Sequence, residues 1–505
     1  EKTRRRVFGQ FRVHDKMTPE EKEKAVENSC LLAAPTGCAS FQLKFGATTL
    51  HRAFGVPVGY CGPWTMNQKR QERYKKMKQR LQQAELFVLD EMSMVGRGMM
   101  GKIAFKVENT LGTEVERSGG DHMAGKDVVL AGDPKQAPPI GEDPLYRNGM
   151  YTGKGQNKPR GEDRTPDNAW PTRRLHMVGQ SVRESFEDVA MLREVHRISE
   201  TRPGLTEKQR ALYRQDAARF LKVTRGMAEC SWKREDHMWL SKRNRSMLEQ
   251  TQEGRQELKR FEDAPLLMDG KKDSCSGVVG ADRLNRKELE KLSAKEQKPI
   301  VVLSAFHTTV QGQENEPESI SAEDFHGVEN EILVCEGARV LLTQNIWVEA
   351  GLMNGALGKV VGYMWPQNAN PHSDRKELRV PTCVFVEFDS VNLGVDETTG
   401  QPRSFFPGDP LRKNWVPIFP QEANSMVDEH MKRANFPLTL AWALTHWKAQ
   451  GMTLDRVGVR LSPKTAASAG IGFVACTRVR HPWDLVFDED LPDYEHFMKA
   501  RHSRK

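Results

Sequence analysis

The stretch LFVLDEMSM at residues 86–94 decides the fold class, because four apolar residues end directly in two carboxylates, Asp90 and Glu91. Two further runs have the same form, CLLAAPTG at residues 30–37 and VVLAGDPKQ at residues 128–136. Such runs are typical of buried parallel strands, and ligands bind at the carboxyl ends of those strands. A strand-ending turn explains any single ending, but three together predict an α/β fold with a site at one sheet edge.

The composition excludes several classes of protein. The chain has 505 residues, enough for about three domains of roughly 150 residues each. Its 38% hydrophobic and 29% charged residues fit folded domains with charged insertions. No apolar run approaches the roughly 18 residues of a membrane-spanning helix, so we expect no membrane segment. The formal net charge of +8 is compatible with a polyanionic partner but does not require one.

The cysteines and the first residues bear on the surroundings of the protein. Eight cysteines are scattered, without a close pair and without His at zinc-finger spacing. We therefore expect neither structural zinc nor a disulfide framework, and scattered thiols indicate a reducing compartment. The chain begins with Glu rather than Met, and no apolar signal core follows. We interpret the sequence as part of a longer protein.

The pattern changes along the chain and suggests domain limits. Residues 66–86 and 241–263 are charged and helical in pattern, and residues 141–174 read as a long loop. From about 334 to 420, β-type runs alternate with Gly, Pro and Asn-Gly turns, which predicts a small β module. The α/β pattern resumes at FPLTLAWAL, residues 436–444. We predict a first domain at 1–180, a second at 181–333 and 431–490, an inserted module at 334–430 and a basic tail at 491–505.

Polar residues after the apolar runs are candidates for nucleotide chemistry. A nucleotide hydrolase needs two carboxylates with different tasks, and Asp90 would hold Mg²⁺ while Glu91 orients and deprotonates the attacking water. Gln136 follows the next run and can hydrogen-bond a γ-phosphate or that water. Arg197 and Arg478 would supply guanidinium groups to the transition state. Taken singly, each has an ordinary alternative as a turn or surface residue.

A second candidate element is LTLAWALTHWKAQGMTLD at residues 438–455. Lys448, Gln450, Gly451 and Thr453 follow an apolar run, and such a turn can donate hydrogen bonds to phosphates. Trp442 and Trp447 (both in this element) can stack on a base, although packing in the core is the favoured interpretation of each.

The order and spacing of the motifs resemble those of the PIF-type (petite integration frequency) DNA helicases, in the RecD-like branch of superfamily 1. In sequence they are APTGCAS, GATTLH, LDEMSM, AGDPKQAPP, LREVHR, GLMNGALGKV, VPI, AWALTHWKAQGMTLD and FVACTRVR. The resemblance covers roughly residues 30–490. It implies two RecA-like domains of the P-loop NTPase class with ATP between them, a small β-barrel inserted in the second, and 5′-to-3′ translocation on single-stranded DNA.

The resemblance also implies roles by position. Glu91, Gln136, Arg197 and Arg478 take catalytic roles, and Asp90 takes the Mg²⁺. The residues implied to bind ATP and its Mg²⁺ are Asp90, Asp133, Gln136, Gly451 and Arg478. Those implied to bind DNA are Pro35, Thr36, Gly37, Thr49, His51, Asn354, Lys448, Gln450 and Thr453. Lys448 to Thr453 match the motif that couples nucleotide state to DNA grip, although His446-Trp447 stand where the family has Ile-His.

The phosphate-binding G-x-x-x-x-G-K-[ST] motif is absent from the sequence. Gly-Lys pairs end at Lys102, Lys126, Lys154, Lys271 and Lys359, and none is followed by Ser or Thr. We expect that the motif lies before residue 1 in the natural protein, so that this chain alone is inactive. The alternatives are a non-catalytic DNA-binding relative and the helicase domain of a rolling-circle transposon protein.

The family also implies surroundings for the protein. The expected partners are single-stranded DNA and duplex or forked DNA, with no membrane, and the chain is expected to be monomeric. The expected location is the nucleus or mitochondrion of a eukaryote, or otherwise the cytoplasm.

Overall fold

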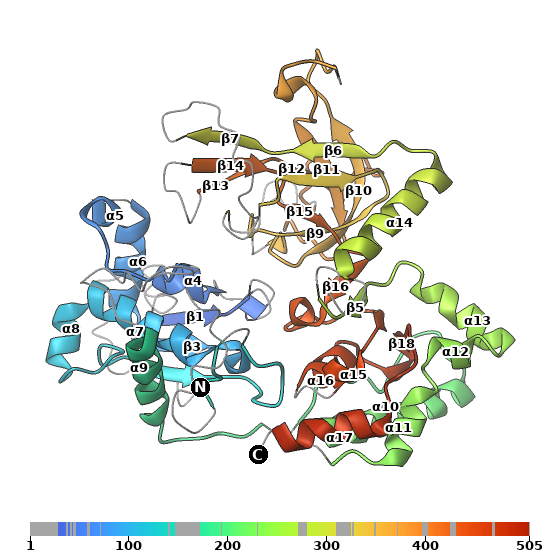
Figure 1. The fold of residues 1–505 in the computed structure, drawn as a ribbon, viewed down its shortest axis with the longest axis horizontal. Coiled ribbons are helices and arrows are strands. Elements are labelled where there is room, and N and C mark those ends of the chain that lie inside the picture. Colours follow the sequence, from blue (N-terminus) through green and yellow to red (C-terminus); the bar gives the residue numbers. More distant parts are fainter. Residues whose placement is uncertain are drawn as a thin grey trace. The chain divides into compact units, whose positions relative to one another are not determined.

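The computed structural model describes most of the chain in segments. These are residues 29–36, 39–40, 43, 47–57, 61–70, 72–139, 142–146, 172–192, 194–229, 231–270, 280–309, 325, 328–347, 350–370, 372–395, 402–424, 431–466 and 470–503. They divide into two compact units (Figure 1). Unit 1 comprises Glu1–Pro134 and Pro138–Met191, and unit 2 comprises Lys135–Ala137 and Leu192–Lys505.

Unit 1 is built on a four-stranded parallel sheet, three of whose strands are the apolar runs that the sequence predicts. The hydrogen-bonded order is β2 (Thr48–Thr49), β1 (Cys30–Ala34), β3 (Leu86–Leu89) and β4 (Asp127–Leu130), and every pairing is parallel. The helices that the structure describes in this unit are α4 (Leu50–Phe54), α5 (Met66–Arg70), α6 (Glu72–Gln83), α7 (Arg97–Thr110), α8 (Gly112–Arg117) and α9 (Thr172–Glu184), with a 3-10 turn η1 at Met92–Met94.

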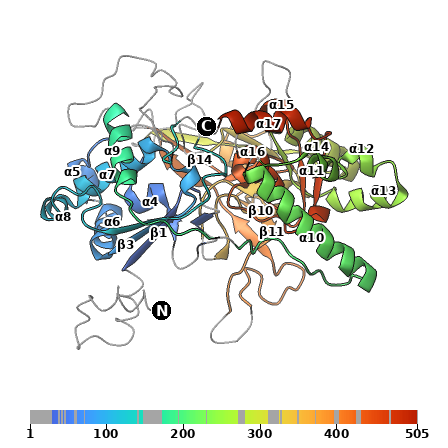
Figure 2. The same cartoon turned by 90° about the horizontal axis from the view of Figure 1, so that it is seen from below.

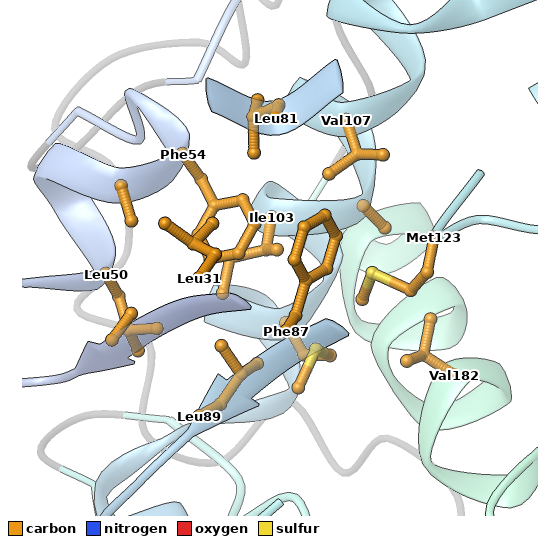
Figure 3. Packing of buried hydrophobic residues seen from close by; sticks show 14 of the residues in the cluster. Leu31, Leu50, Phe54, Leu81, Phe87, Leu89, Ile103, Val107, Met123 and Val182 are labelled. Carbon is orange, nitrogen blue, oxygen red and sulfur yellow. The ribbon is translucent and has the colours of Figure 1, made fainter. Parts of the chain in front are cut away.

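The core of unit 1 lies between this sheet and its helices. Leu31 of β1, Phe87 of β3 and Phe54 of α4 are fully buried, and their side chains point toward one another in Figure 3. The Phe54 and Phe87 rings meet edge to face with centroids 5.4 Å apart, a favourable geometry for aromatic pairs. Alternate residues of β3 are buried in this cluster. This packing holds the end of β3 in place, and Asp90 and Glu91 follow directly after it.

Unit 2 contains a second parallel sheet. Its order is β16 (Ala443–Thr445), β5 (Leu266–Met268), β17 (Val457–Val459) and β18 (Leu485–Phe487), again with every pairing parallel. Its helices, among the residues with described placement, are α10 (Glu207–Ala228), α11 (Arg234–Ser241), α12 (Arg245–Leu248), α13 (Gln252–Leu258), α14 (Ala281–Glu296), α15 (Pro463–Ala466), α16 (Ile471–Cys476) and α17 (Tyr494–Ser503). Short 3-10 turns are η2 (Lys259–Phe261), η6 (His446–Ala449) and η7 (Pro482–Asp484).

The remaining strands of unit 2 pair antiparallel. A five-stranded sheet has the order β12 (Trp415–Ile418), β11 (Cys383–Phe388), β10 (Leu357–Met364), β9 (Arg339–Leu342) and β15 (Leu438–Leu440). The long pair β10 and β11 is visible in both views (Figure 1; Figure 2). Two smaller sheets are β13 (Gln421–Asn424), β14 (Met431–Asn435) and β7 (Phe306–Thr309), and β6 (Val301–Ser304) with β8 (Glu331–Val334).

The strands differ from the sequence prediction at the limits of the β module. Antiparallel pairing begins at β6 and ends at β15, so it extends beyond residues 334–430 on both sides. The segment 436–444 does not resume the parallel sheet at its start, because Leu438–Leu440 pairs with β9 and only Ala443–Thr445 joins β5. Within 491–505, predicted as a tail, α17 packs the ring of Phe497 against Trp232.

Candidate functional site

Hydrogen bonds place the carboxyl ends of three strands of unit 1 side by side. The amide of Asp90 donates to the carbonyl oxygen of Ala33 at the end of β1, at 2.9 Å. The amide of Met92 donates to the carbonyl oxygen of Ala131, just after β4, also at 2.9 Å. Asp90 and Glu91 therefore leave the sheet between β1 and β4, at the edge where α/β folds bind ligands.

The backbone at this edge has an uncommon conformation. Glu91 has φ 52° and ψ 47°, in the left-handed region that non-glycine residues rarely adopt. Gly132 faces it with φ 142°, and a Cβ on Gly132 would come within 2.6 Å of the amide nitrogen of Met92. Glycine is thus required for the two turns to pack against each other. Strain in a residue such as Glu91 is typical of functional sites, where surrounding contacts hold it.

The carboxylate of Asp90 is half-buried. Burial raises the pKa of Asp90, and a backbone hydrogen bond from Glu91 opposes that rise. A nearby cation would favour the charged form that burial disfavours, so the position suits a metal ligand. Within the part of the chain that the structure describes, no group of three or more His, Cys, Asp or Glu side chains could hold a metal ion. A single carboxylate fits Mg²⁺, which keeps waters and binds substrate phosphates.

Two segments that the resemblance assigns to DNA meet at the same edge. Ala34 of β1 pairs with Thr49 of β2, so the residues that follow each strand are neighbours. The hydroxyl of Thr36 accepts from the amide of Ala39 at 3.2 Å, and that of Thr49 accepts from Arg52 at the start of α4. Pro35 and His51 are partly exposed beside them, whereas Gly37 lies outside the described residues.

Asn354, also assigned to DNA, lies in unit 2. It is exposed in the turn between β9 and β10, and its amide donates to Oδ1 of Asn345 at 2.8 Å. The structure therefore presents this side chain on the antiparallel sheet and not on a parallel one.

The two predicted catalytic arginines come together in unit 2. Arg197 Nη1 donates to the carbonyl oxygen of Thr477 at 3.0 Å, and Arg478 Nη2 donates to the hydroxyl of the same Thr477 at 3.1 Å. Arg478 Nε also donates to the carbonyl oxygen of Val474 at 2.9 Å, and the residue is only 1% exposed. Arg478 and Arg480 both lie beyond α16, which ends at Cys476.

The irregular segment that contains Arg197 makes further hydrogen bonds in addition to the one between Arg197 and Thr477. Ser199 donates its amide to the carbonyl oxygen of Arg480 at 2.9 Å. Asp484 accepts from Arg202 and from Arg260, each at 3.1 Å. These contacts hold residues 197–202 against the segment that follows α16, so the two arginine side chains belong to one rigid arrangement.

The Gln136 loop, residues Lys135–Ala137, is part of unit 2. Ala137 lies in an apolar cluster with Ile471 and Val474 of α16. The carbonyl oxygen of Gln136 lies where a Cβ of Gly470 would be, and Gly470 has φ 85°. The side-chain oxygen Oε1 of Gln136 is buried and has no hydrogen-bond partner among the described residues. A buried acceptor of this kind suits a group that bonds a ligand.

The turn that contains Lys448, Gln450 and Thr453 begins in η6. Lys448 is exposed, Gln450 is 1% exposed, and Gly451 turns the chain with φ 81°. Thr453 is partly buried just beyond the turn. We call residues 447–453 the coupling turn.

The two tryptophans near this turn pack in the protein, which confirms the favoured interpretation. Trp447 packs against the α16 cluster, and Trp442 packs against the apolar cluster of the antiparallel sheet.

Sequence reasoning missed Asp269, Gly470 and Thr477. Asp269 follows an apolar run, LLMDG at 266–270, and this is the same signal that pointed to Asp90. No sequence pattern marks Gly470 or Thr477, because their roles arise from contacts with distant segments.

Comparison with known proteins shows which helicases the chain is similar to. Residues 19–150 match the family model for the PIF1-like helicase. ATP-dependent DNA helicase PIF1 of Homo sapiens is 29% identical over 171 residues, which are 34% of this chain and 21% of that protein. The Xenopus laevis protein of that name is 29% identical over 154 residues, 30% of this chain and 19% of that protein. The chain is thus similar to the PIF1-type helicases over roughly a third of its length.

Solved structures agree with the PIF1-type fold. The crystal structure of Pif1 helicase from Candida albicans matches with TM-score 0.58 at 19% identity, over 96% of this chain and 91% of that one. Bacteroides Pif1 in complex with ADP-AlF3 and single-stranded DNA matches with TM-score 0.53 at 18% identity, over 94% and 87%. These likenesses establish the α/β fold with RecA-like domains. The chain matches only about a fifth of the length of the PIF1 proteins of Homo sapiens and Xenopus laevis.

One further observation concerns membranes. Over the described ranges, no helix is both long enough and apolar enough to cross a bilayer.

Proposed function

We propose that this chain is the motor region of an ATP-dependent DNA helicase that moves 5′-to-3′ along single-stranded DNA and unwinds duplex or forked DNA. The observation that carries the proposal is the pair of hydrogen bonds from Asp90 to Ala33 and from Met92 to Ala131. They bring two carboxylates and the DNA-assigned segments to the carboxyl edge of one parallel sheet. Such an edge can couple phosphate chemistry to movement of a bound strand.

Each candidate residue has a definite task in this proposal. Asp90 holds Mg²⁺, which supplies positive charge for the phosphates of ATP, and Asp133 contributes to binding of the nucleotide. Glu91 orients a water molecule and accepts its proton, while the buried amide of Gln136 bonds that water or the γ-phosphate. Arg197 and Arg478 stabilise the negative charge of the transition state, and Gly451 lies against the nucleotide.

The DNA tasks fall to two sets of residues. Pro35, Thr36, Gly37, Thr49 and His51 contact the strand from unit 1. Asn354, Lys448, Gln450 and Thr453 contact it from unit 2, and Lys448 is the exposed cation among them. Contacts of Lys and Arg with phosphates release counterions, so binding weakens as the salt concentration rises.

The first test is binding of single-stranded DNA by the 505-residue chain, measured by fluorescence anisotropy of a labelled oligothymidylate. We expect saturable binding with a negative slope of log affinity against log salt. Lys448→Ala should weaken binding and reduce that slope by about one unit. Asp236→Asn is a control, because this carboxyl is buried at the start of α11 and accepts a hydrogen bond from the amide of Lys233. Absence of binding by the unmodified chain would contradict the proposal.

The second test concerns hydrolysis. No Gly-Lys pair in residues 1–505 precedes Ser or Thr, which favours a second candidate function, a DNA-binding protein without turnover. In a protein that adds a phosphate-binding loop to this chain, Glu91→Gln should keep ATP binding and abolish turnover, because an amide cannot accept the proton. DNA binding without any hydrolysis in that longer protein would favour the second candidate.

The cellular setting is part of the same proposal. We infer a monomer that acts in DNA replication, repair, recombination or telomere maintenance, in the nucleus or mitochondrion of a eukaryote or otherwise in the cytoplasm. Analytical ultracentrifugation of the chain with and without single-stranded DNA tests the monomer.

A further inference from the structure

A buried pair of side chains connects two strand ends in the second parallel sheet. His446 follows β16 and is 1% exposed, and its Nε2 lies 3.3 Å from Oδ1 of Asp269, which follows β5. The same Nε2 lies 3.1 Å from the carbonyl oxygen of Arg460, after β17. Both neighbours are acceptors, so Nε2 carries the hydrogen. The carboxyl ends of three strands are therefore joined through one imidazole ring.

Asp269 is itself firmly held. The hydroxyl of Thr465 and the amide of Ser462 both donate to this carboxylate, the amide at 3.3 Å. Burial alone would raise the pKa of Asp269, but these hydrogen bonds and the one from His446 lower it to about 2. Asp269 is thus a fixed anion that faces the first residue of η6.

The carbonyl oxygen on the other side of His446 is fixed as well. The Arg460 guanidinium bonds Oδ2 of Asp488 at 2.6 Å, and Arg245 bonds Oδ1 of the same carboxylate at 3.1 Å. The two groups that accept from His446, the Asp269 carboxylate and the Arg460 carbonyl oxygen, are therefore both held in place by other hydrogen bonds. Together they fix the position of the imidazole ring.

His446 is the residue directly before the coupling turn. Trp447 anchors the beginning of this turn on α16, and Lys448 then projects to solvent. An Ile in place of His446 could not donate a hydrogen bond to Asp269. The interaction therefore depends on both residues, the carboxylate of Asp269 and the imidazole of His446. A directional hydrogen bond between a carboxylate and an imidazole positions a turn more closely than an apolar contact, which is non-directional.

We propose that Asp269 is a positioning residue which, through His446, fixes the coupling turn so that Lys448 engages the phosphates of single-stranded DNA. This inference rests on the proposed function. Asp269 does not touch DNA in this arrangement. Its effect on DNA affinity passes through the orientation of the turn, and it disappears when Lys448 is removed.

The experiment is a double-mutant cycle on the 505-residue chain, read by anisotropy of a fluorescein-labelled oligothymidylate. Asp269→Asn should weaken binding by about five- to tenfold, because the pair is lost and the turn shifts. In the Lys448→Ala background the same change should alter affinity by less than about twofold. Asp236→Asn, a buried carboxyl elsewhere in unit 2, should leave affinity unchanged.

A second series keeps the test informative if Asp269→Asn does not fold. His446→Gln retains a donor near the position of Nε2 and should keep affinity within about twofold, whereas His446→Leu should weaken it about as much as Asp269→Asn. Equal affinities for the Gln and Leu variants would overturn the inference. Additive losses of DNA affinity in the Asp269 and Lys448 cycle would also overturn it. A residue that only stabilises the fold would weaken binding to the same extent with or without Lys448.

The outcomes separate this inference from the proposed function. If the unmodified chain binds no single-stranded DNA, both fail. If it binds and the Asp269 and His446 variants bind equally well, the helicase proposal stands and the positioning role fails.

Discussion

Arg197 donates a hydrogen bond from Nη1 to the carbonyl oxygen of Thr477, 280 residues further along the chain, at 3.0 Å. Arg478 donates to the hydroxyl of the same threonine. Thr477 therefore organises both arginines that the sequence motifs single out, one through its backbone and one through its side chain. A single residue at the end of α16 links two motifs that lie far apart in the sequence.

The first prediction concerns the Thr477 hydroxyl. It accepts from Arg478 and donates to the carbonyl oxygen of Phe473 at 2.8 Å. Thr477→Val removes it at nearly constant volume, so we expect a loss of about 1–2 kcal/mol in the free energy of unfolding. Thermal unfolding measures this as a lower Tm. Thr477→Ser keeps the hydroxyl and is the matched control, and an equal loss from both variants would show that the hydrogen bonds contribute nothing.

The second prediction compares Arg478 with Arg480. Arg478 is 1% exposed and bonds Val474 and Thr477, so Arg478→Ala should remove two hydrogen bonds and the packing of a buried side chain, and lower stability by roughly 2–4 kcal/mol. Arg480 is a mostly exposed side chain that pairs with exposed Asp455 at 3.4 Å. Arg480→Ala should change stability by less than about 0.5 kcal/mol, as surface pairs contribute little. Similar Tm shifts for the two variants would contradict the assignment of Arg478 as the buried, bonded residue.

The sequence predicts this fold well wherever the signal is local. Three apolar runs that end in polar residues correspond to β1, β3 and β4, and their shared edge carries Asp90 and Glu91. The limits of the β module were harder to predict. The strand β7 pairs with β14 across more than a hundred residues, and nothing in four residues of β-type sequence reveals such a partner.

The parts of the site that sequence reasoning missed depend on contacts between distant segments. Asp269 carries the same local signal as Asp90, yet its partner His446 follows a different strand. Gly470 is required because the backbone of Gln136 approaches it. A close approach of this kind has no periodicity, so only the folded chain reveals it.

The third prediction is a pH dependence. The pKa of Asp269 is about 2 in the folded chain, below the value of about 3.9 for an unfolded Asp. Its stabilisation, about 2 kcal/mol, is fully present above about pH 5 and is lost as the pH falls through about 4 toward 2. The difference in unfolding free energy between the unmodified chain and Asp269→Asn, from urea titrations, should be constant from pH 8 to 5 and shrink at pH 3. A constant difference at every pH would refute the assigned pKa shift.

The fourth prediction concerns strain at Glu91. Its φ of 52° costs a non-glycine residue about 1 kcal/mol, whereas glycine adopts it freely. Glu91→Gly should therefore be more stable than Glu91→Ala by about 1 kcal/mol, after the larger chain entropy of glycine is included. The Tm values of the two variants measure the difference. An alanine variant as stable as the glycine variant would show that the backbone at residue 91 is relaxed.

The last prediction concerns the contact between Gly470 and Gln136. Gly470 and Gly408 both have φ 85°, but a Cβ on Gly408 would meet no atom within 4 Å, whereas one on Gly470 would overlap the carbonyl oxygen of Gln136. Gly408→Ala should thus cost only the left-handed strain, about 1–2 kcal/mol. Gly470→Ala should cost at least about 2 kcal/mol more, because the backbone of residues 135–137 must move.

The comparison isolates the contact, since the backbone angle is the same at both glycines. Thermal unfolding gives the two costs, and hydrogen exchange at the amides of Lys135 and Gln136 reports where the movement occurs. Faster exchange at those amides in Gly470→Ala, and not in Gly408→Ala, would show that Gly470 holds the predicted phosphate-sensing loop against α16. Equal Tm shifts with unchanged exchange would mean that the loop does not depend on a glycine at position 470. Gln136 would then have to be positioned by the strand β4 that precedes it.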